Sequence, residues 1–344
     1  MSGAERYRAA GVDLDTAEEA KRRIAELVQG TRTPLATGSV GGFGGMVRLP
    51  AGLGDPVLVM STDGVGTKVL VAIRAGRHHT VGEDLVNHCV NDILVHGATP
   101  IAFLDYIAAA KIDPAVAERI VEGVARGCRA HQMTLVGGET AALPDLYQAG
   151  HYDLAGTIVG VVEARDALHG DRVSPGDVLI GYAAGGLHTN GYTLARRIIF
   201  QDMGLDVSDP FPEDGRSVAD VLLEVHRSYF AALRPVISRV HALAHITGGG
   251  IPGNLARVLP QGCRAVVNAG AWEWPAVFRV LQRAGKVSTD EMRRVFNLGI
   301  GMIAIAGSPD VEPLRQAARA ARIETCVIGE IGVGNGGGDV QFNA

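Results

Sequence analysis

The sequence predicts two domains of mixed helix and sheet, residues 1–170 and 171–344. The chain has 344 residues, more than a single hydrophobic core usually serves. Aromatic residues make up only 5%, which favours small and β-branched side chains packed between helices and sheets over an aromatic-rich β-sandwich. Strand and helix patterns alternate along the chain and break at 164–177, where charged and turn residues gather.

In the first half, the patterns predict a helix capped by Asp15 and ended by Gly30, and a buried strand at Val57 to Met60. The segment Gly82 to His96 is predicted to be helical, with apolar residues on one side and Asp84, His88, Asn91 and Asp92 on the other. The elements expected after it are a strand at 100–107, a helix opened by Asp113 and Pro114 and ending near 130, a strand and turn at 135–140, and a strand at 153–163.

In the second half, the expected order begins with a strand at 178–183, a glycine turn at 185–191 and a helix at 192–200. Helices are predicted near 218–240, 254–259 and 275–284, and strands near 300–306 and 325–331. No repeat of 20–50 residues is present.

Composition excludes several classes of protein. Glycine accounts for 46 residues, close to double the usual share of about 7%, but it follows no three-residue period, which excludes collagen. The net charge of −5 and the lack of a long basic run argue against nucleic acid as a partner. No apolar leader or membrane-spanning stretch is found, so a cytoplasmic protein without a membrane partner is expected. The four cysteines are too far apart to indicate a zinc site.

Familiar nucleotide motifs are missing or misplaced. The G-x-G-x-x-G at Gly332, Gly334 and Gly337 lies seven residues from the end, where it cannot open a helix toward a pyrophosphate, and a flexible tail is expected there. Lys68 follows Thr67 rather than glycine, which excludes the common P-loop.

The strongest candidate is the turn from Thr62 to Lys68. Glycines at 64 and 66 let backbone N–H groups approach a phosphate, Lys68 supplies a positive charge, and Asp63 offers carboxylate oxygen to Mg²⁺. An ordinary turn with a solvated lysine explains this segment equally well.

Two further carboxylates favour a site that binds phosphate and Mg²⁺ over an ordinary turn. Asp92 lies on the polar side of its helix and Glu139 lies in a glycine turn, and three separated carboxylates suit Mg²⁺ held jointly with nucleotide phosphates. In the second half, His188 and Asn190 lie in a glycine-flanked turn where an imidazole can contact a phosphate or move a proton. The simpler alternatives, a solvated face for Asp92, a turn residue for Glu139 and a helix cap for Asn190, stay open.

Together these motifs resemble the phosphoribosylformylglycinamidine cyclo-ligase family nearly from end to end. The matching blocks are Tyr7-Arg-Ala-Ala-Gly-Val-Asp13, Gly41-Gly-Phe-Gly44, Thr62-Asp-Gly-Val-Gly-Thr-Lys68, Cys89-Val-Asn-Asp92, Phe103-Leu-Asp-Tyr106, Val136-Gly-Gly-Glu-Thr140, His188-Thr-Asn-Gly-Tyr192 and Thr247-Gly-Gly-Gly250. The resemblance implies phosphorylation of the formyl oxygen of formylglycinamidine ribonucleotide by ATP, followed by ring closure to 5-aminoimidazole ribonucleotide in purine biosynthesis. Thiamine-monophosphate kinase and selenophosphate synthetase activities, or a catalytically silent binding protein, are the competing hypotheses.

The resemblance also implies roles for individual residues. Lys68, His188 and Asn190 are expected to be catalytic, and Asp63, Asp92 and Glu139 to hold Mg²⁺ on ATP. The ATP-binding residues implied are Gly41, Gly42, Phe43, Gly44, Asp63, Gly64, Gly66, Thr67, Lys68, Asp92, Gly138, Glu139 and Thr140. The implied fold is α+β, with the N-terminal strands of a homodimer forming a shared barrel and the C-terminal domain a sheet packed with helices. One departure is that Ala25, Gln29 and Gly30 occupy the region where the family often carries lysines.

Overall fold

The computed structural model describes residues 14–38, 44–334 and 336–343. The chain forms two compact units, one of Met1–Val90 and Pro100–Val161 and the other of Asn91–Thr99 and Val162–Ala344. The change of unit after Val161 comes nine residues before the expected boundary, and no local pattern predicted that the short segment at 91–99 belongs with the second unit. No helix in the described part of the chain is long and apolar enough to span a membrane.

The first unit contains a four-stranded sheet in the order β1 (Pro56–Gly64), β4 (Tyr152–Glu163), β2 (Thr99–Ala109), β3 (Thr134–Ala142). Strands β2 and β3 are parallel, with Tyr106 opposite Glu139. The expected turn at 135–140 is therefore wrong in part, because Glu139 lies inside β3, paired along the edge of the sheet.

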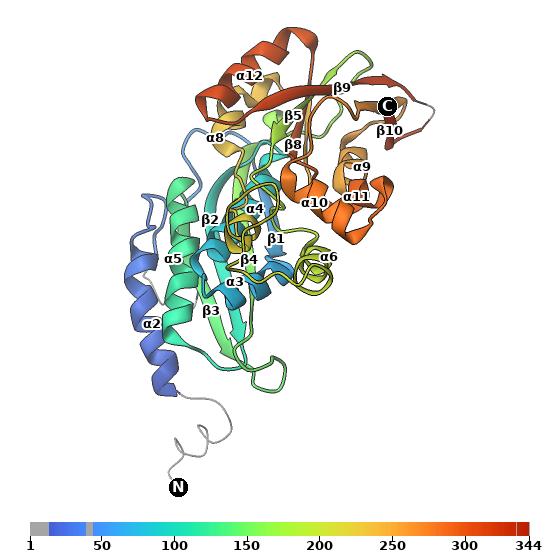
Figure 1. The fold of residues 1–344 in the computed structure, drawn as a ribbon. Coiled ribbons are helices and arrows are strands. Elements are labelled where there is room, and N and C mark those ends of the chain that lie inside the picture. Colours follow the sequence, from blue (N-terminus) through green and yellow to red (C-terminus); the bar gives the residue numbers. More distant parts are fainter. Residues whose placement is uncertain (1–13, 39–43, 335, 344) are drawn as a thin grey trace. The chain divides into compact units, whose positions relative to one another are not determined.

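Helices α2 (Leu14–Gln29) and α5 (Pro114–Ala130) run side by side in this unit (Figure 1). Asp113 caps α5 as predicted, because its Oδ1 accepts the N–H of Ala115 at 2.9 Å. Asp15 lies in the first turn of α2 and not before it. The unit also contains α3 (Val69–Ala75) and begins α4 (His79–Leu94).

Two glycines let α4 and α5 approach closely. A Cβ on Gly123 would lie 1.9 Å from the carbonyl oxygen of His79, and one on Gly82 would lie 2.1 Å from that of Ile120. No side chain fits at such distances, so these glycines are required by helix packing. Part of the glycine excess therefore has a structural cause that the sequence did not show.

The predicted strand at Val57 to Met60 is confirmed, but the prediction that it is buried was wrong. These residues lie in β1 at the edge of the sheet, and Val57, Leu58 and Met60 are 41%, 46% and 61% exposed. Leu104 and Tyr106 of β2 are exposed as well. An apolar run in a sequence predicts burial, but in the single chain these apolar side chains of β1 and β2 are exposed to solvent.

The second unit is built on a six-stranded sheet in the order β10, β7, β9, β5, β8, β6. Their bounds are β5 Val178–Ala183, β6 Ala242–His245, β7 Cys263–Asn268, β8 Ile300–Ala306, β9 Thr325–Val333 and β10 Asp339–Asn343. Only β10 and β7 pair in parallel among the described strands of this sheet. The expected strands at 178–183 and 300–306 are confirmed at both ends.

Apolar side chains cover both faces of this sheet. One face packs against α9 (Gly250–Leu255), and the other against α8 (Phe230–Leu233) and α12 (Val311–Ala320). Every residue of β8 is buried, which is why that strand is a continuous apolar run in the sequence. The remaining helices are α6 Tyr192–Arg196, which continues as a π-helix over Arg197–Asp202, α7 Val218–Leu222, α10 Ala276–Gly285 and α11 Thr289–Val295.

Two expectations about this unit need correction. The long helix predicted near 218–240 is broken into α7, α8 and the 3₁₀ helix Arg234–Arg239. The segment between α7 and α8 is held outside a helix by Asn91, whose Oδ1 accepts the N–H of Tyr229 and whose Nδ2 donates to the carbonyl of Arg227. The glycines near 334–338 connect β9 to β10 and open no helix among the described residues, so the tail is part of the sheet.

Asp105 of β2 gives the first unit a predicted pH dependence. Burial raises the pKa of its carboxyl from 3.8 to about 7. The folded chain therefore keeps a proton that the unfolded chain has lost, and stability falls as pH rises through this interval. Asp105→Asn is expected to raise the unfolding free energy at pH 8 by about 1–3 kcal/mol more than at pH 5. Thermal unfolding at both pH values tests this, and equal shifts would contradict it.

Candidate functional site

The glycine turn after β1 places a lysine and an aspartate in different environments. Strand β1 ends at Gly64, Gly66 adopts a left-handed φ of 63°, and the 3₁₀ helix Gly66–Lys68 leads into α3. Asp63 is 44% exposed, whereas Lys68 is completely buried. The turn was predicted correctly as a strand end, but Lys68 is not directed to solvent.

Asp63 is held by the backbone of Gly64 and by the side chain of His88. Its Oδ1 accepts the N–H of Gly64 at 2.6 Å, and its Oδ2 lies 2.8 Å from Nε2 of His88 on α4. His88 is buried, so this contact fixes the carboxylate while leaving it partly open to solvent. An exposed, oriented carboxylate at a strand end suits a hard cation.

Lys68 forms a buried ion pair with Asp84 of α4. The Lys68 Nζ lies 2.9 Å from Oδ1 and 2.8 Å from Oδ2, and neither side chain is exposed to solvent. Such a pair is held in a low-dielectric environment, where removing one partner is costly. The catalytic role expected for Lys68 remains a prediction, but the structure gives this lysine a structural partner that sequence reasoning missed.

The remaining candidates of the first unit do not gather around Asp63. Glu139 is exposed on β3, and its Oε1 accepts the N–H of Thr140 at 2.8 Å. Asp63 and Glu139 lie on β1 and β3, the two edges of a four-stranded sheet, and these two strands are roughly 14 Å apart by strand spacing. Gly138 borders Asp105, and Gly44 is exposed with open space beside it. Gly41, Gly42 and Phe43 lie outside the described residues.

In the second unit, His188 occupies a strained turn. It has a left-handed φ of 62°, and its Nε2 accepts the N–H of Gly185 at 3.3 Å. Gly191, with φ 77°, precedes α6, and the Nδ2 of Asn190 lies 3.5 Å from Oγ1 of Thr189. A buried imidazole in a left-handed conformation persists only where its surroundings hold it in place.

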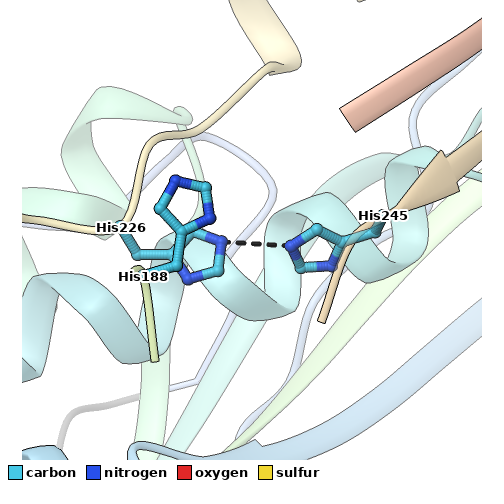
Figure 2. Close-up of side chains that lie close together, drawn as sticks. All are labelled: His188, His226 and His245. Atoms are coloured by element: carbon cyan, nitrogen blue, oxygen red, sulfur yellow. Dashed lines mark hydrogen bonds between the residues drawn. The ribbon is translucent and has the colours of Figure 1, made fainter. Parts of the chain in front are cut away.

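Three buried histidines meet in this unit (Figure 2). The rings of His188 and His226 are stacked, with centroids 4.0 Å apart and planes inclined by 24°. Nε2 of His226 lies 3.1 Å from Nε2 of His245, and Nδ1 of His245 lies 2.8 Å from Oδ1 of Asp92. Asp92 thus stands at one end of a chain of side chains that reaches His188.

The three rings do not form a good metal site, although their nitrogens lie within 4.8 Å of one another. Imidazole lone pairs lie in the ring plane, and the stacked planes of His188 and His226 direct them side by side rather than toward one ion. The cluster is better described as a hydrogen-bonded and stacked network.

The glycine loop after β6 is organised by Asn254. Its Nδ2 lies within hydrogen-bond distance of the carbonyls of Thr247, Gly248 and Gly250, and its Oδ1 accepts from Oγ1 of Thr247 at 3.2 Å. Gly249 and Gly250 have φ of 96° and 61°. The loop begins two residues after His245, the last residue of β6, so its hydrogen bonds also hold the end of that strand.

Gly301 of β8 leaves the room that His188 needs. A Cβ at this position would lie 2.1 Å from Oη of Tyr229 and 2.4 Å from Cε1 of His188. Gly301→Ala is expected to lower the unfolding free energy by about 1–3 kcal/mol through overpacking. Thermal unfolding of this variant measures the loss. Gly253→Ala is the control, because nothing lies within 4 Å of its added methyl group, and an equal loss in both variants would contradict the steric explanation.

Helix α4 carries four of the polar residues described above. The sequence predicted these residues but not their partners. Asp84, His88, Asn91 and Asp92 were expected on one side of it, and the structure gives each a fixed partner. His226 and His245 were not predicted. A signal for His245 existed, because it lies two residues before the glycine loop at 247–250, whereas nothing in the sequence around His226 marked it.

Two family models match successive parts of this chain. Residues 41–162 match the family model "AIR synthase related protein, N-terminal domain", and residues 174–340 match "AIR synthase related protein, C-terminal domain". A curated phosphoribosylformylglycinamidine cyclo-ligase of Sorangium cellulosum is 48% identical over 94% of both chains, and one of Trichlorobacter lovleyi is 45% identical over the same shares. This chain belongs to the phosphoribosylformylglycinamidine cyclo-ligase family.

Solved structures show how widely the fold of this family occurs. Thiamine-monophosphate kinase from Stenotrophomonas maltophilia superposes with a TM-score of 0.69 at 19% identity, covering 94% of this chain and 96% of the kinase. The hydrogenase maturation protein HypE in complex with ATP gives a TM-score of 0.66 at 20% identity, covering 94% and 90%. At these identities the likeness shows the fold alone.

Proposed function

We propose that this chain catalyses the ATP-dependent cyclisation of formylglycinamidine ribonucleotide to 5-aminoimidazole ribonucleotide, with release of ADP and phosphate. The observation that carries the proposal is the identity of 45–48% to curated cyclo-ligases over 94% of the chain. The chain is accordingly a C–N bond-forming ligase of purine biosynthesis. The likeness to thiamine-monophosphate kinase is far lower, so a kinase or synthetase with another substrate is not favoured.

The chemistry needs an activated oxygen. The formyl oxygen accepts the γ-phosphoryl group of ATP, an internal nitrogen attacks the formyl carbon, and the carbon–oxygen bond breaks as phosphate leaves. We assign His188 and Asn190 to the reacting centre. Because Nε2 of His188 accepts the Gly185 N–H, a neutral ring carries its hydrogen on Nδ1, an atom that is buried in this structure.

ATP and Mg²⁺ belong to the same proposal. Asp63 is partly exposed, oriented by His88 and suited to a hard cation, and Asp92 is 25% exposed and held by His245. With Glu139 they are the proposed Mg²⁺ ligands, and Mg²⁺ would neutralise the charge on the ATP phosphates. The glycine turns at 41–44, 64–66 and 138 would bring backbone N–H groups close to ATP, with Thr67, Lys68 and Thr140 beside them.

A homodimer with a shared barrel is also proposed. Two observations support it: the apolar side chains of β1 and β2 are exposed in the single chain, and Asp63 and Glu139 lie on opposite edges of one sheet. Pairing two such sheets covers the apolar surface and offers Asp63 a Glu139 from a second copy. A cytoplasmic location completes the proposal, because its substrates are soluble nucleotides.

The function is tested by supplying the purified chain with formylglycinamidine ribonucleotide, ATP and Mg²⁺. We expect ADP and aminoimidazole ribonucleotide to form in equal amounts, with ADP release dependent on the ribonucleotide. ATP turnover that requires thiamine monophosphate or selenide instead would overturn the assignment.

A further inference from the structure

The side chain of His226 contacts several neighbours in the second unit, and the proposed function gives this residue no role. Its Nδ1 lies 3.3 Å from Oγ1 of Thr189, its Nε2 lies 3.1 Å from His245, and its ring stacks on His188. Asn91 adds a contact at 3.2 Å. The side chain is completely buried, so these contacts fully determine its orientation.

The backbone that carries His226 is also fixed. Arg227 donates to the carbonyl of Ala183 at 2.9 Å, and Tyr229 Oη donates to the same carbonyl at 3.2 Å. Asn91 holds the segment from the other side through Arg227 and Tyr229. A histidine in an irregular segment with this many anchors presents its ring face rigidly.

The fixed ring of His226 holds His188 in place. Its left-handed backbone is an unfavourable conformation for a side chain of this size, so the turn needs support from outside. The His226 ring supplies that support through the stack, while the bond between Thr189 and His226 fixes the next residue of the turn. Both contacts act on the turn that carries the proposed reacting-centre histidine.

We propose that His226 is a positioning residue that acts through His188. It orients the His188 ring and is itself oriented by His245, whose other nitrogen contacts Asp92. The inference rests on the proposed function, because the role of His188 does.

A double-mutant cycle tests it. His226→Phe keeps a ring but loses the hydrogen bonds, and His226→Asn loses the stack. Each is expected to lower kcat by at least about tenfold while changing the KM for ATP less than about threefold. In a His188→Ala background neither is expected to lower kcat further, since the group through which they act is gone. Losses that multiply in the double variants would overturn the proposal.

His131→Asn is the matched control. His131 is a buried histidine of the first unit, and its Nε2 lies 3.1 Å from Oδ1 of Asn87. Its kcat is expected to stay within about twofold of wild type after the substitution. An equal loss of kcat in His131→Asn and His226→Asn would reduce His226 to a general packing residue and contradict the proposal.

An activity-independent measurement separates this inference from the proposed function. In ¹⁵N-histidine-labelled protein, the His188 ring signals are identified by their loss in His188→Ala. We expect His226→Asn to shift or broaden them and His131→Asn to leave them unchanged. Unchanged His188 signals in His226→Asn overturn the positioning role even if the wild type turns over, whereas changed signals in a chain without turnover overturn only the function.

Discussion

Asp63→Asn and Asp92→Asn are each expected to lower ATP turnover by at least about 100-fold while changing the unfolding free energy by less than about 1 kcal/mol. Ligation of Mg²⁺ needs a full negative charge, which asparagine lacks. The fold needs less, because an amide oxygen in place of Asp63 Oδ1 still accepts the Gly64 N–H, and both carboxylates are partly exposed. Steady-state ADP release and thermal unfolding of the same preparations measure the two effects.

Asp153→Asn is the matched control for Asp63→Asn. Asp153 is exposed in the same unit, and its Oδ1 accepts the N–H of the next residue, Leu154, at 2.9 Å. Turnover by this variant is expected to stay within about twofold of wild type. Parallel losses of turnover and stability in the Asp63 and Asp92 variants would instead assign those residues a structural role.

Lys68→Met is expected to cost about 3–5 kcal/mol of unfolding free energy, the largest stability loss that we predict. The substitution leaves the Asp84 carboxylate buried without the ammonium that lies 2.8 Å from it. Adding Asp84→Asn should recover part of the loss, because the uncompensated charge is then removed. Chemical denaturation of the single and double variants measures both terms.

The control for this prediction is Lys21→Met. Lys21 pairs with Glu18 at 2.9 Å, nearly the same separation, but the two side chains are 66% and 73% exposed. Solvent screens such a pair, so the expected loss is far smaller than that at Lys68. A similar loss at both lysines would show that burial of the Lys68 pair contributes nothing.

Local patterns predicted much of the fold. Asp113 with Pro114 marked the start of α5, and the apolar run at 300–306 marked a strand covered on both faces. These features depend on neighbours in the sequence, which is why periodicity and capping residues were sufficient. The order of strands in the two sheets depends on pairing between distant segments, and no local pattern encoded it.

Where the predictions failed, a distant contact was responsible. The long helix expected near 218–240 is interrupted because Asn91 takes the backbone groups of Arg227 and Tyr229. The apolar run at 57–60 suggested burial, but in the single chain Val57, Leu58 and Met60 are exposed, because a local pattern does not show which segments lie against a strand. Gly82 and Gly123 looked like ordinary glycines and serve to pack two helices.

The candidate site was predicted residue by residue but not as a network. The turn at 62–68 and the polar side of α4 were identified, because glycine spacing and helical periodicity are visible in a sequence. The contacts between the turn and the helix were not visible in the sequence. Lys68 pairs with Asp84, and Asp63 pairs with His88. His226 was not predicted as a site residue because it lies in an irregular segment, where no periodicity identifies a buried side chain.

The central claim, that ATP activates the formyl oxygen for ring closure, is tested most directly by isotope transfer. Formylglycinamidine ribonucleotide carrying ¹⁸O in its formyl group is converted with unlabelled ATP, and the released phosphate is examined by mass spectrometry. We predict one ¹⁸O atom in each phosphate, because the phosphorylated oxygen leaves with it. Unlabelled phosphate alongside formation of the imidazole, or no imidazole at all, would contradict the account.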